Sequence, residues 1–239
     1  MTSQQSRRGA PRGRRTRPSD SHDRDHVNTS NLTSITALPP VEAPTGFFDL
    51  GVPARIDDGL AACGFAQPFN IQTEAIPVAM TGKDVCGRAK TGSGKTLAFG
   101  IPMLARITDK AAPMKPLGLV LVPTRELAVQ VAEVLQPVAD HAGMKVIPVY
   151  GGASRHHQVE EMARGVEIVV ATPLRLIDLI KSDEINLDDI QIVTLDEADR
   201  MADDGFTPQV EWILRHTGNR NQTMLFSATL DGDVGHLIR

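Results

Sequence analysis

Six short apolar runs, separated by longer segments of helical periodicity, constrain the fold of this 239-residue chain more than any other feature. The runs have strand length, most end in polar or turn-forming residues, and they read DVCGRA, LGLVLVPT, KVIPVYGG, EIVVATP, QIVTLDEAD and TMLFSAT. Segments between them, such as RELAVQVAEVLQPVADHAG and PLRLIDLIKS, carry apolar residues at helical spacing. Alternating strand and helix patterns predict an α/β fold, with a mostly parallel central sheet and helices on both faces.

The composition agrees with a buried parallel sheet. Hydrophobic residues make up 41% of the chain and aromatic residues only 4%, which favours a core of Val, Ile, Leu and Ala over a β-sandwich. In such sheets ligands bind beyond the carboxyl ends of the strands, so the polar ends of the six runs should line one edge.

Two cysteines without a CxxC spacing favour reduced thiols in a cytoplasmic protein and argue against structural zinc. No apolar run reaches the roughly 18 residues of a membrane span.

The first 44 residues predict a disordered tail rich in Arg, Gly, Pro and Ser, and residues 45–239 predict the folded domain. Residues 1–40 hold seven Arg and three Asp, a charge of +4, whereas the remainder holds 18 basic and 26 acidic residues, a charge of −8. A segment of this composition buries too little apolar surface to offset its ordering entropy. The domain should open with a helix in FFDLGVPARIDDGLAACGF, ended by Gly64, and a second short helix in IQTEAIPVAM.

The stretch AKTGSGKT, between a short strand and an apolar helix, predicts a loop that binds the phosphates of ATP. It differs from the usual phosphate-loop pattern only at Ala89, where the first glycine would stand. Gly92 and Gly94 let backbone N–H groups turn inward, Lys95 would neutralise the β- and γ-phosphates, and the Thr96 hydroxyl would bind Mg²⁺. An ordinary turn with an exposed lysine is disfavoured by the strand–loop–helix context. The predicted nucleotide-binding residues of the loop are Ala89, Lys90, Thr91, Gly92, Ser93, Gly94, Lys95 and Thr96.

An acidic pair follows the buried run IVTL. Beside a phosphate loop, Asp196 is the expected second partner of Mg²⁺, and Glu197 is placed to orient or deprotonate the attacking water. With Lys95, these two carboxylates form the predicted catalytic group. Taken alone, the pair could equally be an acidic turn at a strand end. Lys95 and Asp196 are both expected to face a solvent-filled site, so that replacing either should not affect the fold.

Over residues 47–239 the chain resembles the DEAD-box ATP-dependent RNA helicases. Asp196-Glu197-Ala198-Asp199 spells the family's name motif, and seven motifs follow the family order. Besides the phosphate loop and the acidic box, they are GFAQPFNIQ ending in Gln72, PTRELA, Gly151-Gly152, TPLR and SAT. The resemblance implies a RecA-like domain that binds ATP and couples its hydrolysis to local RNA unwinding or ribonucleoprotein remodelling.

The resemblance also implies roles for individual residues. Gln72 would bind the adenine edge, and Phe65 or Phe48 would cover the base, although core packing explains either phenylalanine equally well. Sequence-independent contacts to RNA phosphate and sugar are implied for Pro123, Thr124, Arg125, Gly151, Gly152, Thr172, Pro173 and Arg175. Arg125 could instead form a structural salt bridge. Hydrogen bonds among Asp199, Ser227 and Thr229 would couple the ATP side to the RNA side.

The sequence departs from the family pattern at two positions and lacks a second domain. Phe69 replaces a threonine that would support Gln72 or the loop, and Leu174 replaces a glycine near the RNA. Active members have two RecA-like domains, and the second supplies arginine fingers. The chain is therefore expected to be the first domain only, to be monomeric, and to bind ATP without unwinding RNA.

Two other functions are compatible with parts of the sequence. One is a DNA-directed helicase of the same superfamily, which the Gln72 motif and the DEAD spelling disfavour. The other is an RNA-binding or chaperone module that acts mainly through the basic tail, without catalysis.

Overall fold

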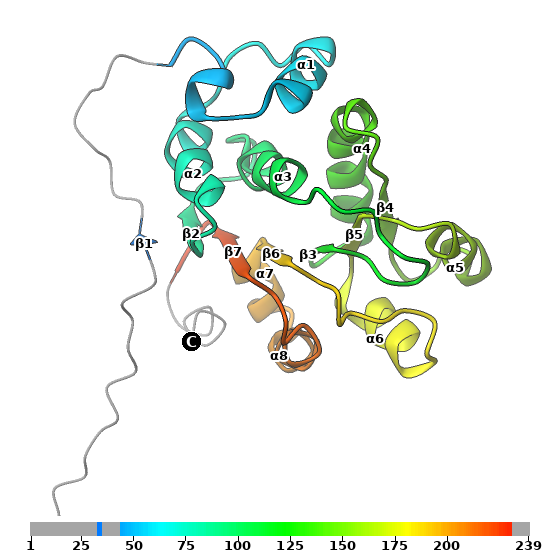
Figure 1. The fold of residues 1–239 in the computed structure, drawn as a ribbon. Coiled ribbons are helices and arrows are strands. Elements are labelled where there is room, and N and C mark those ends of the chain that lie inside the picture. The colour runs from blue at the N-terminus through cyan, green and yellow to red at the C-terminus, as the bar shows by residue number, and fades with distance from the viewer. Residues whose placement is uncertain (1–32, 35–43, 231–239) are drawn as a thin grey trace, which may run out of the picture. The chain divides into compact units, whose positions relative to one another are not determined.

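The computed structural model describes residues 33–34 and 44–230. Within them, seven strands form one sheet in the order β1-β2-β7-β6-β3-β5-β4, and every neighbouring pair is parallel. The strands are β1 (Thr33–Ser34), β2 (Val85–Arg88), β3 (Gly118–Leu121), β4 (Val146–Val149), β5 (Ile168–Ala171), β6 (Ile192–Asp196) and β7 (Gln222–Ser227). Each of the six apolar runs thus forms one of the strands β2 to β7, which confirms the predicted α/β fold (Figure 1).

Helices follow the strands along the chain, as the alternating pattern predicts. They are η1 (Phe48–Leu50), α1 (Ala54–Ala62), α2 (Asn70–Met80), α3 (Lys95–Arg106), α4 (Arg125–His141), α5 (Arg155–Ala163), α6 (Pro173–Lys181), α7 (Ala198–Asp203) and α8 (Thr207–Arg215). Among the described residues, no helix is both long and apolar enough to cross a bilayer.

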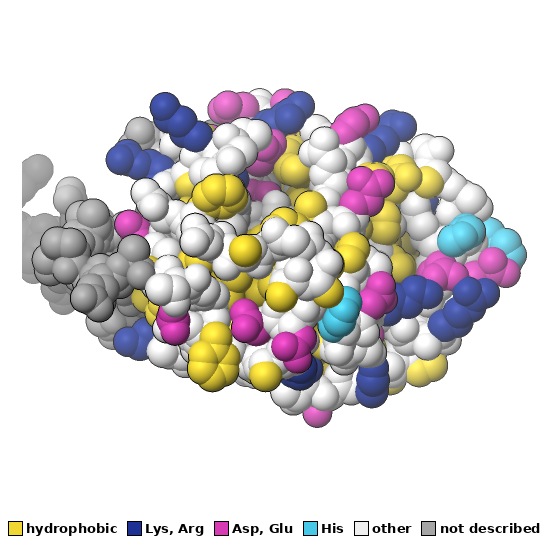
Figure 2. Space-filling model, turned by 90° about the horizontal axis from the view of Figure 1, so that it is seen from above, with side chains coloured by type: hydrophobic (Ala, Val, Ile, Leu, Met, Phe, Trp, Pro, Cys, Tyr) yellow, Lys and Arg dark blue, Asp and Glu magenta, His cyan; other side chains and the backbone are white. Residues whose placement is uncertain are grey.

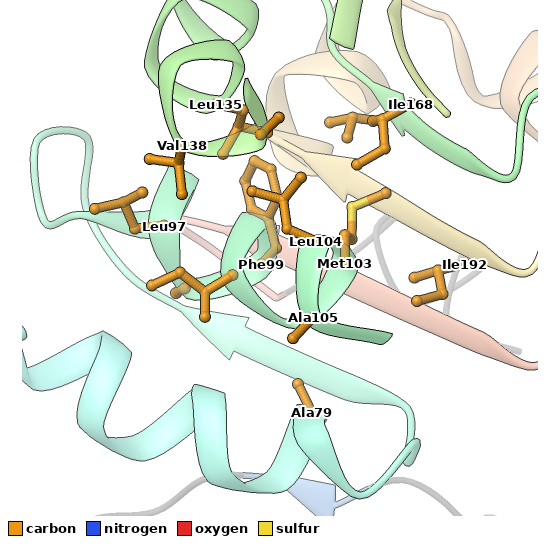
Figure 3. Packing of buried hydrophobic residues seen from close by; sticks show 14 of the residues in the cluster. Ala79, Leu97, Phe99, Met103, Leu104, Ala105, Leu135, Val138, Ile168 and Ile192 are labelled. Carbon is orange, nitrogen blue, oxygen red and sulfur yellow. The ribbon is translucent and has the colours of Figure 1, made fainter. Parts of the chain in front are cut away.

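Both faces of the sheet are covered, because side chains alternate along each strand. In β3, Val120 packs into a core formed with α1 to α4, whereas Leu119 and Leu121 pack into a second core formed with α5 to α8. Figure 3 shows the first core, where Phe99 and Leu104 of α3 lie between α4 and the sheet. The prediction of helices on both faces is confirmed.

Gly64 ends α1 as predicted. Its φ of +82° is a left-handed conformation that favours glycine. Two hydrogen bonds close the helix: the Gly64 N–H donates to the carbonyl of Ala61 at 3.0 Å, and the Phe65 N–H donates to that of Leu60 at 2.9 Å. This turn directs the chain after Phe65 toward the start of α2, beside the phosphate loop.

The predicted disordered tail lies almost wholly outside the described residues, and its disorder stays a prediction. The exceptions are Pro44 and strand β1, whose Thr33 and Ser34 pair in parallel with Val85 and Cys86 of β2. Two residues of the tail segment therefore extend the edge of the sheet next to the strand that leads into the phosphate loop.

Candidate nucleotide and RNA site

The predicted phosphate loop joins the end of β2 to the start of α3. Gly92 (φ +80°) and Gly94 (φ +88°) both have a left-handed backbone, which favours glycine. The Ala89 N–H donates to the Ser227 carbonyl at 2.9 Å, so Ala89 continues the β2–β7 pairing and needs no glycine. The Ser93 hydroxyl donates to the Lys90 carbonyl at 2.6 Å and closes the loop. The N-terminus of the 12-residue helix α3 therefore faces the loop, as anion binding requires.

A cavity of about 590 Å³ lies against this loop. It brings together most of the predicted nucleotide-site residues, which come from the segment before α2, α2 itself, the loop, α3, the end of β6 and the start of α7. The lining residues are Phe47, Phe65, Gln67, Phe69, Gln72, Thr91, Gly92, Gly94, Lys95, Thr96, Leu97, Leu127, Gln130, Val131, Glu133, Val134, Asp196 and Glu197. The side chain of Lys90 is exposed, and Ala89, Lys90 and Ser93 belong to the loop without lining the cavity.

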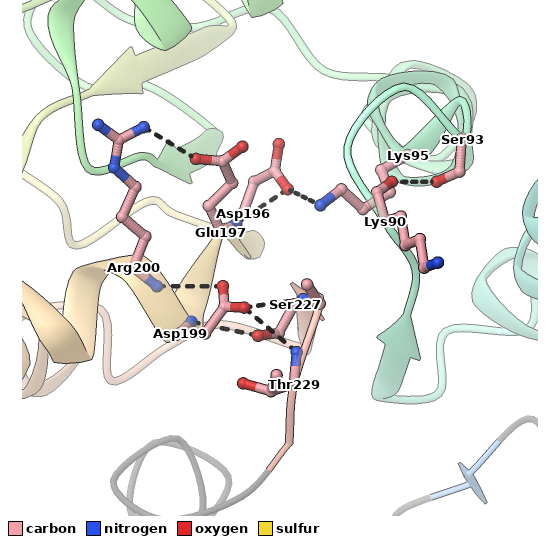
Figure 4. A network of polar contacts seen from close by, with 10 residues as sticks. Lys90, Ser93, Lys95, Asp196, Glu197, Asp199, Arg200, Ser227 and Thr229 are labelled. Carbon is pink, nitrogen blue, oxygen red and sulfur yellow. Dashed lines mark hydrogen bonds and ion pairs between the residues drawn. The ribbon is translucent and has the colours of Figure 1, made fainter.

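Lys95 and Asp196 form an ion pair at the end of the cavity, with Nζ 3.7 Å from Oδ1 (Figure 4). Both residues line the cavity, yet Lys95 is only 7% exposed and Asp196 only 2%, which corrects the expectation of solvent-facing side chains. Burial raises the pKa of Asp196 to about 6, although the nearby Lys95 ammonium opposes that rise. Removing either partner would therefore leave a buried charge without its counterion.

The pair predicts a dependence of stability on pH. The pKa of Asp196 rises from 3.8 to about 6 on folding, so between these values the folded state keeps a proton that the unfolded state releases. The free energy of unfolding therefore falls with rising pH across this window, by roughly 3 kcal/mol from this group. As the pH rises through this window, the free energy of unfolding of wild type should fall by that amount relative to that of Asp196→Asn, which has no carboxylate at this position. Denaturant unfolding of both proteins from pH 4 to pH 7 measures it, and a constant difference would contradict the prediction.

Glu197 follows Asp196 at the start of α7 with a left-handed backbone, φ +53° and ψ +49°. This conformation costs a non-glycine residue about 1–2 kcal/mol. Its N–H donates to Asp196 Oδ1 at 2.9 Å, and its Oε2 lies 3.5 Å from Nη1 of Arg200. The strained turn keeps the two carboxylates adjacent while both line the cavity. Arg200 was not anticipated from the sequence, since only the folded turn of α7 brings it back to Glu197.

The residues present fit a magnesium ion. The Thr96 hydroxyl and the Asp196 carboxylate are oxygen donors, the kind that Mg²⁺ prefers, and both line the cavity. No group of three or more His, Cys, Asp or Glu side chains suited to a metal occurs within residues 33–34 and 44–230. Mg²⁺ commonly takes only one or two carboxylates and completes its shell with water and substrate phosphate.

Gln72, which also lines the cavity, connects α2 to the loop. Its Oε1 accepts from the Phe69 N–H at 2.8 Å, and its Nε2 donates to the Gly94 carbonyl at 2.9 Å. Gln72 is 1% exposed. Its hydrogen bond to the Gly94 carbonyl supports the positive-φ turn at that glycine. The implied contact between Gln72 and adenine stays a prediction.

Of the two phenylalanines implied for the base, Phe65 lines the cavity, but Phe48 does not. Phe48 is 66% exposed, whereas its neighbour Phe47 is 2% exposed and lines the cavity. Adjacent residues at the start of the 3₁₀ turn η1 point in different directions, and the core takes Phe47. Which phenylalanine covers the base stays a prediction; of the two that the resemblance implied, only Phe65 lines the cavity, and two consecutive aromatic residues gave no signal that Phe47 would line it instead of Phe48.

A second hollow, of about 400 Å³, contains most of the predicted RNA contacts. It lies where α4 and α6 begin, so two helix N-termini meet at it. Its lining residues are Pro123, Thr124, Arg125, Glu126, Gly151, Thr172, Pro173, Leu174, Arg175, Asp178 and Phe206. Phe206 was not anticipated, because it reaches the hollow from the distant α7–α8 turn.

Gly152 is outside the lining of this hollow, but it determines how Arg125 lies. Its φ is +90°, and a Cβ there would lie 2.4 Å from Nη1 of Arg125. Within the described residues Arg125 has no ion-pair partner, which argues against the structural salt bridge.

Two other predicted RNA contacts form hydrogen bonds within the domain. Thr124 caps α4 by accepting from the Leu127 N–H at 3.2 Å. Arg175 Nη1 donates to Oε1 of Gln158 at 3.1 Å.

Hydrogen bonds join the acidic box to the end of β7, as predicted for the coupling residues (Figure 4). The Asp199 N–H donates to the Ser227 hydroxyl oxygen at 3.1 Å, and the Asp199 carboxylate accepts from the N–H groups of Ala228 and Thr229 at 3.1 and 3.2 Å. Thr229 thus takes part through its backbone N–H. Burial alone would raise the pKa of Asp199, but hydrogen bonds from Arg200, Ser227, Thr229 and Ala228 lower it below its usual value.

Charge is mixed on the face of the domain that Figure 2 shows. The face in Figure 2 carries acidic and basic side chains side by side, with apolar side chains between them and no extended patch of one sign. A broad positive field for nucleic acid is therefore not a feature of this face. At the second hollow, the groups whose chemistry suits phosphate are the two helix N-termini and the guanidinium groups of Arg125 and Arg175.

Comparison with known proteins agrees with this geometry. Residues 69–237 match the DEAD/DEAH box helicase family. The chain is 43% identical over 195 residues to DEAD-box ATP-dependent RNA helicase 42 of Oryza sativa (79% of this chain, 19% of that protein). It is 44% identical over 192 residues to RNA helicase CrhR of Synechocystis (80% of this chain, 38% of that protein). It covers 17 to 38% of the length of such relatives.

Two solved structures have the same fold. The RNA helicase Prp28 from Chaetomium thermophilum bound to ADP has a TM-score of 0.76 and 37% identity, over 83% of this chain and 48% of that chain. A hypothetical ATP-dependent RNA helicase from Sulfolobus tokodaii has a TM-score of 0.70 and 40% identity, over 77% of this chain and 53% of that chain. The fold is therefore a RecA-like helicase domain, and the chain belongs to the DEAD/DEAH box helicase family.

Proposed function

We propose that this chain is the ATP-binding first half of an ATP-dependent RNA helicase that unwinds short duplexes or remodels ribonucleoprotein. One observation carries the proposal: a phosphate-loop cavity and a hollow with two helix N-termini lie at the carboxyl edge of one parallel sheet. The relatives' names, all ATP-dependent or RNA helicases, support the substrates. A DNA-directed helicase has no such support.

In the nucleotide cavity, the inward backbone of Gly92 to Gly94 and the N-terminus of α3 would bind the β- and γ-phosphates of ATP. Lys95 would leave Asp196 and donate to the phosphate oxygens. When bound, Mg²⁺ would neutralise phosphate charge, held by Thr96 and by the Asp196 carboxylate that Lys95 releases. Glu197 would orient and deprotonate the attacking water.

RNA would bind at the second hollow through its sugar–phosphate backbone. The N-termini of α4 and α6, the Thr172 hydroxyl and the guanidinium groups of Arg125 and Arg175 are donors suited to phosphate and carry no base information. Leu174, which is 54% exposed, extends an apolar side chain beside this hollow where the family has glycine. The hydrogen bonds that Asp199 donates to Ser227 and accepts from Ala228 and Thr229 would transmit changes in the nucleotide cavity to the end of β7.

Residues 1–239 alone should bind adenine nucleotides weakly and should not unwind RNA. One half of a two-domain cleft makes only part of the contacts, so we expect a dissociation constant in the high-micromolar range or weaker, roughly −5 kcal/mol. Fluorescent ADP titration and a duplex-unwinding assay with and without ATP measure the two properties. Robust strand separation by this chain alone, or no nucleotide binding at millimolar concentration, would contradict the proposal.

The basic tail should add sequence-independent affinity for RNA. Six arginines without an intervening acid, all outside the described residues, are Arg7, Arg8, Arg12, Arg14, Arg15 and Arg17. Each phosphate neutralised on a single strand contributes about 0.7 to the slope of log K against log salt, so three or four engaged arginines contribute roughly 2–3. Deleting residues 1–30 removes all six and leaves β1 intact. RNA affinity across a salt series, with and without the deletion, measures the change, and identical slopes would exclude an RNA contact.

The same deletion tests the non-enzymatic alternative. RNA binding that requires the tail and survives loss of Lys95 would favour an RNA-binding or chaperone module. We further propose a monomeric cytoplasmic protein, a location supported by Cys63 and Cys86, both free thiols.

A further inference from the structure

Phe69 occupies a position that is unfavourable for phenylalanine on grounds of stability. It is the N-cap residue of α2, where Ser, Thr, Asp or Asn would accept a hydrogen bond from the first turn, and a phenyl ring cannot. Its side chain is nevertheless 62% exposed, so the ring gains little from burial. A residue that neither caps its helix nor fills the core points to a role outside folding.

The ring lies on the wall of the nucleotide cavity, beside the phosphate loop. Its Cδ2 would lie 2.6 Å from a Cβ built on Gly94, so the ring packs directly against the backbone of the loop's last residue. The Phe69 N–H is held by Gln72 Oε1 at 2.8 Å, and Gln72 in turn donates to the Gly94 carbonyl. The backbone that carries the ring is therefore held to the loop, and the ring has an open face.

We propose that Phe69 stacks on the base of the bound nucleotide and supplies much of the affinity for that base. This rests on the proposed ATP binding and assigns its base contact. Among the aromatic residues that line the cavity, Phe47 is 2% exposed and belongs to the core, so it has little surface to offer a ligand. Phe65 is half-buried and also packs against the core, whereas Phe69 presents most of its ring. The amide of Gln72, almost inaccessible, holds the loop.

Stacking requires an aromatic side chain at position 69, whereas capping of α2 requires a side chain that accepts a hydrogen bond. Substitutions at this position can therefore separate the two roles. Phe69→Ala should weaken ADP binding by about 3- to 10-fold, as expected for the loss of one aromatic stacking partner. Phe69→Thr should weaken ADP similarly, yet raise Tm by about 2–4 °C, because its hydroxyl can cap α2. Phe69→Tyr should retain wild-type affinity. GDP affinity should fall by the same factor as ADP affinity in Phe69→Ala, because stacking on the face of a base does not distinguish guanine from adenine.

Inorganic triphosphate and Phe48→Ala are the controls. Triphosphate binds the loop without a base, so its affinity should be unchanged in every Phe69 variant. Phe48 is equally exposed but lies outside the cavity, and its replacement should leave ADP affinity unchanged. Unchanged ADP affinity in Phe69→Ala, or equal losses for ADP and triphosphate, would overturn the proposal. Failure of wild type to bind ADP would instead overturn the proposed function, and with it this inference.

Discussion

Replacing Lys95 with alanine is expected to weaken ATP and ADP binding at least about 100-fold while the domain remains folded. Charge-assisted hydrogen bonds contribute about 1.5–3 kcal/mol each, and the Lys95 ammonium offers three donors at the N-terminus of α3. Nucleotide titration of the full-length protein by calorimetry or fluorescence measures the loss, because residues 1–239 alone are expected to bind too weakly for a change of about 100-fold to be followed. The matched control is Lys90→Ala, because Lys90 lies in the same loop with an exposed side chain that does not line the cavity. Equal losses of nucleotide affinity in both variants would show that the effect comes from removing any positive charge near the loop.

The same substitution should also lower stability. Without Lys95, the Asp196 carboxylate is buried without its cation, and breaking such a pair costs of order 3 kcal/mol. Adding Asp196→Asn to Lys95→Ala removes the unpaired charge and should restore much of the stability without restoring nucleotide binding. Thermal unfolding near pH 7 of the single and double variants separates the two effects. A double variant no more stable than Lys95→Ala would show that the ion pair does not account for the loss.

Replacing Glu197 with glutamine should spare nucleotide binding and reduce ATP hydrolysis by about 10²- to 10⁴-fold, the usual contribution of a general base. Glutamine keeps the size and polarity of the side chain but cannot accept a proton, and the strained turn beside Asp196 should be retained. Steady-state ATP turnover by the full-length protein, with single-stranded RNA present, measures the loss.

Arg200→Ala is a useful control for Glu197, since it removes the 3.5 Å ion pair without touching the carboxylate. We expect a much smaller loss of turnover in that variant. Normal turnover in Glu197→Gln would show that another group activates the water. Weaker ATP binding in Glu197→Gln would instead give this carboxylate a role in holding the substrate.

Local sequence patterns were sufficient for the fold. The apolar runs became β2 to β7 because a strand buried on both faces needs nearly continuous hydrophobic residues, a pattern visible without tertiary information. Gly64 could be assigned to a helix end, and Gly92 and Gly94 to the turns of a phosphate loop, because glycine adopts backbone conformations that few other residues reach. Helix α5 was harder to recognise, since only Gln158 and Met162 are buried in it and no apolar stripe appears.

The chemistry of the site was readable from residue types, but its exposure and contacts were not. The parallel α/β fold and the loop that carries Lys95 could be predicted from the chain, because apolar pattern and glycine content are local properties. The buried pair of Lys95 and Asp196, the position of Phe47 rather than Phe48 at the cavity, and the packing of Phe69 on Gly94 could not, since each arises from the folded arrangement. These depend on which side chains the packing of distant segments shields from water, and spacing along the chain does not specify that packing.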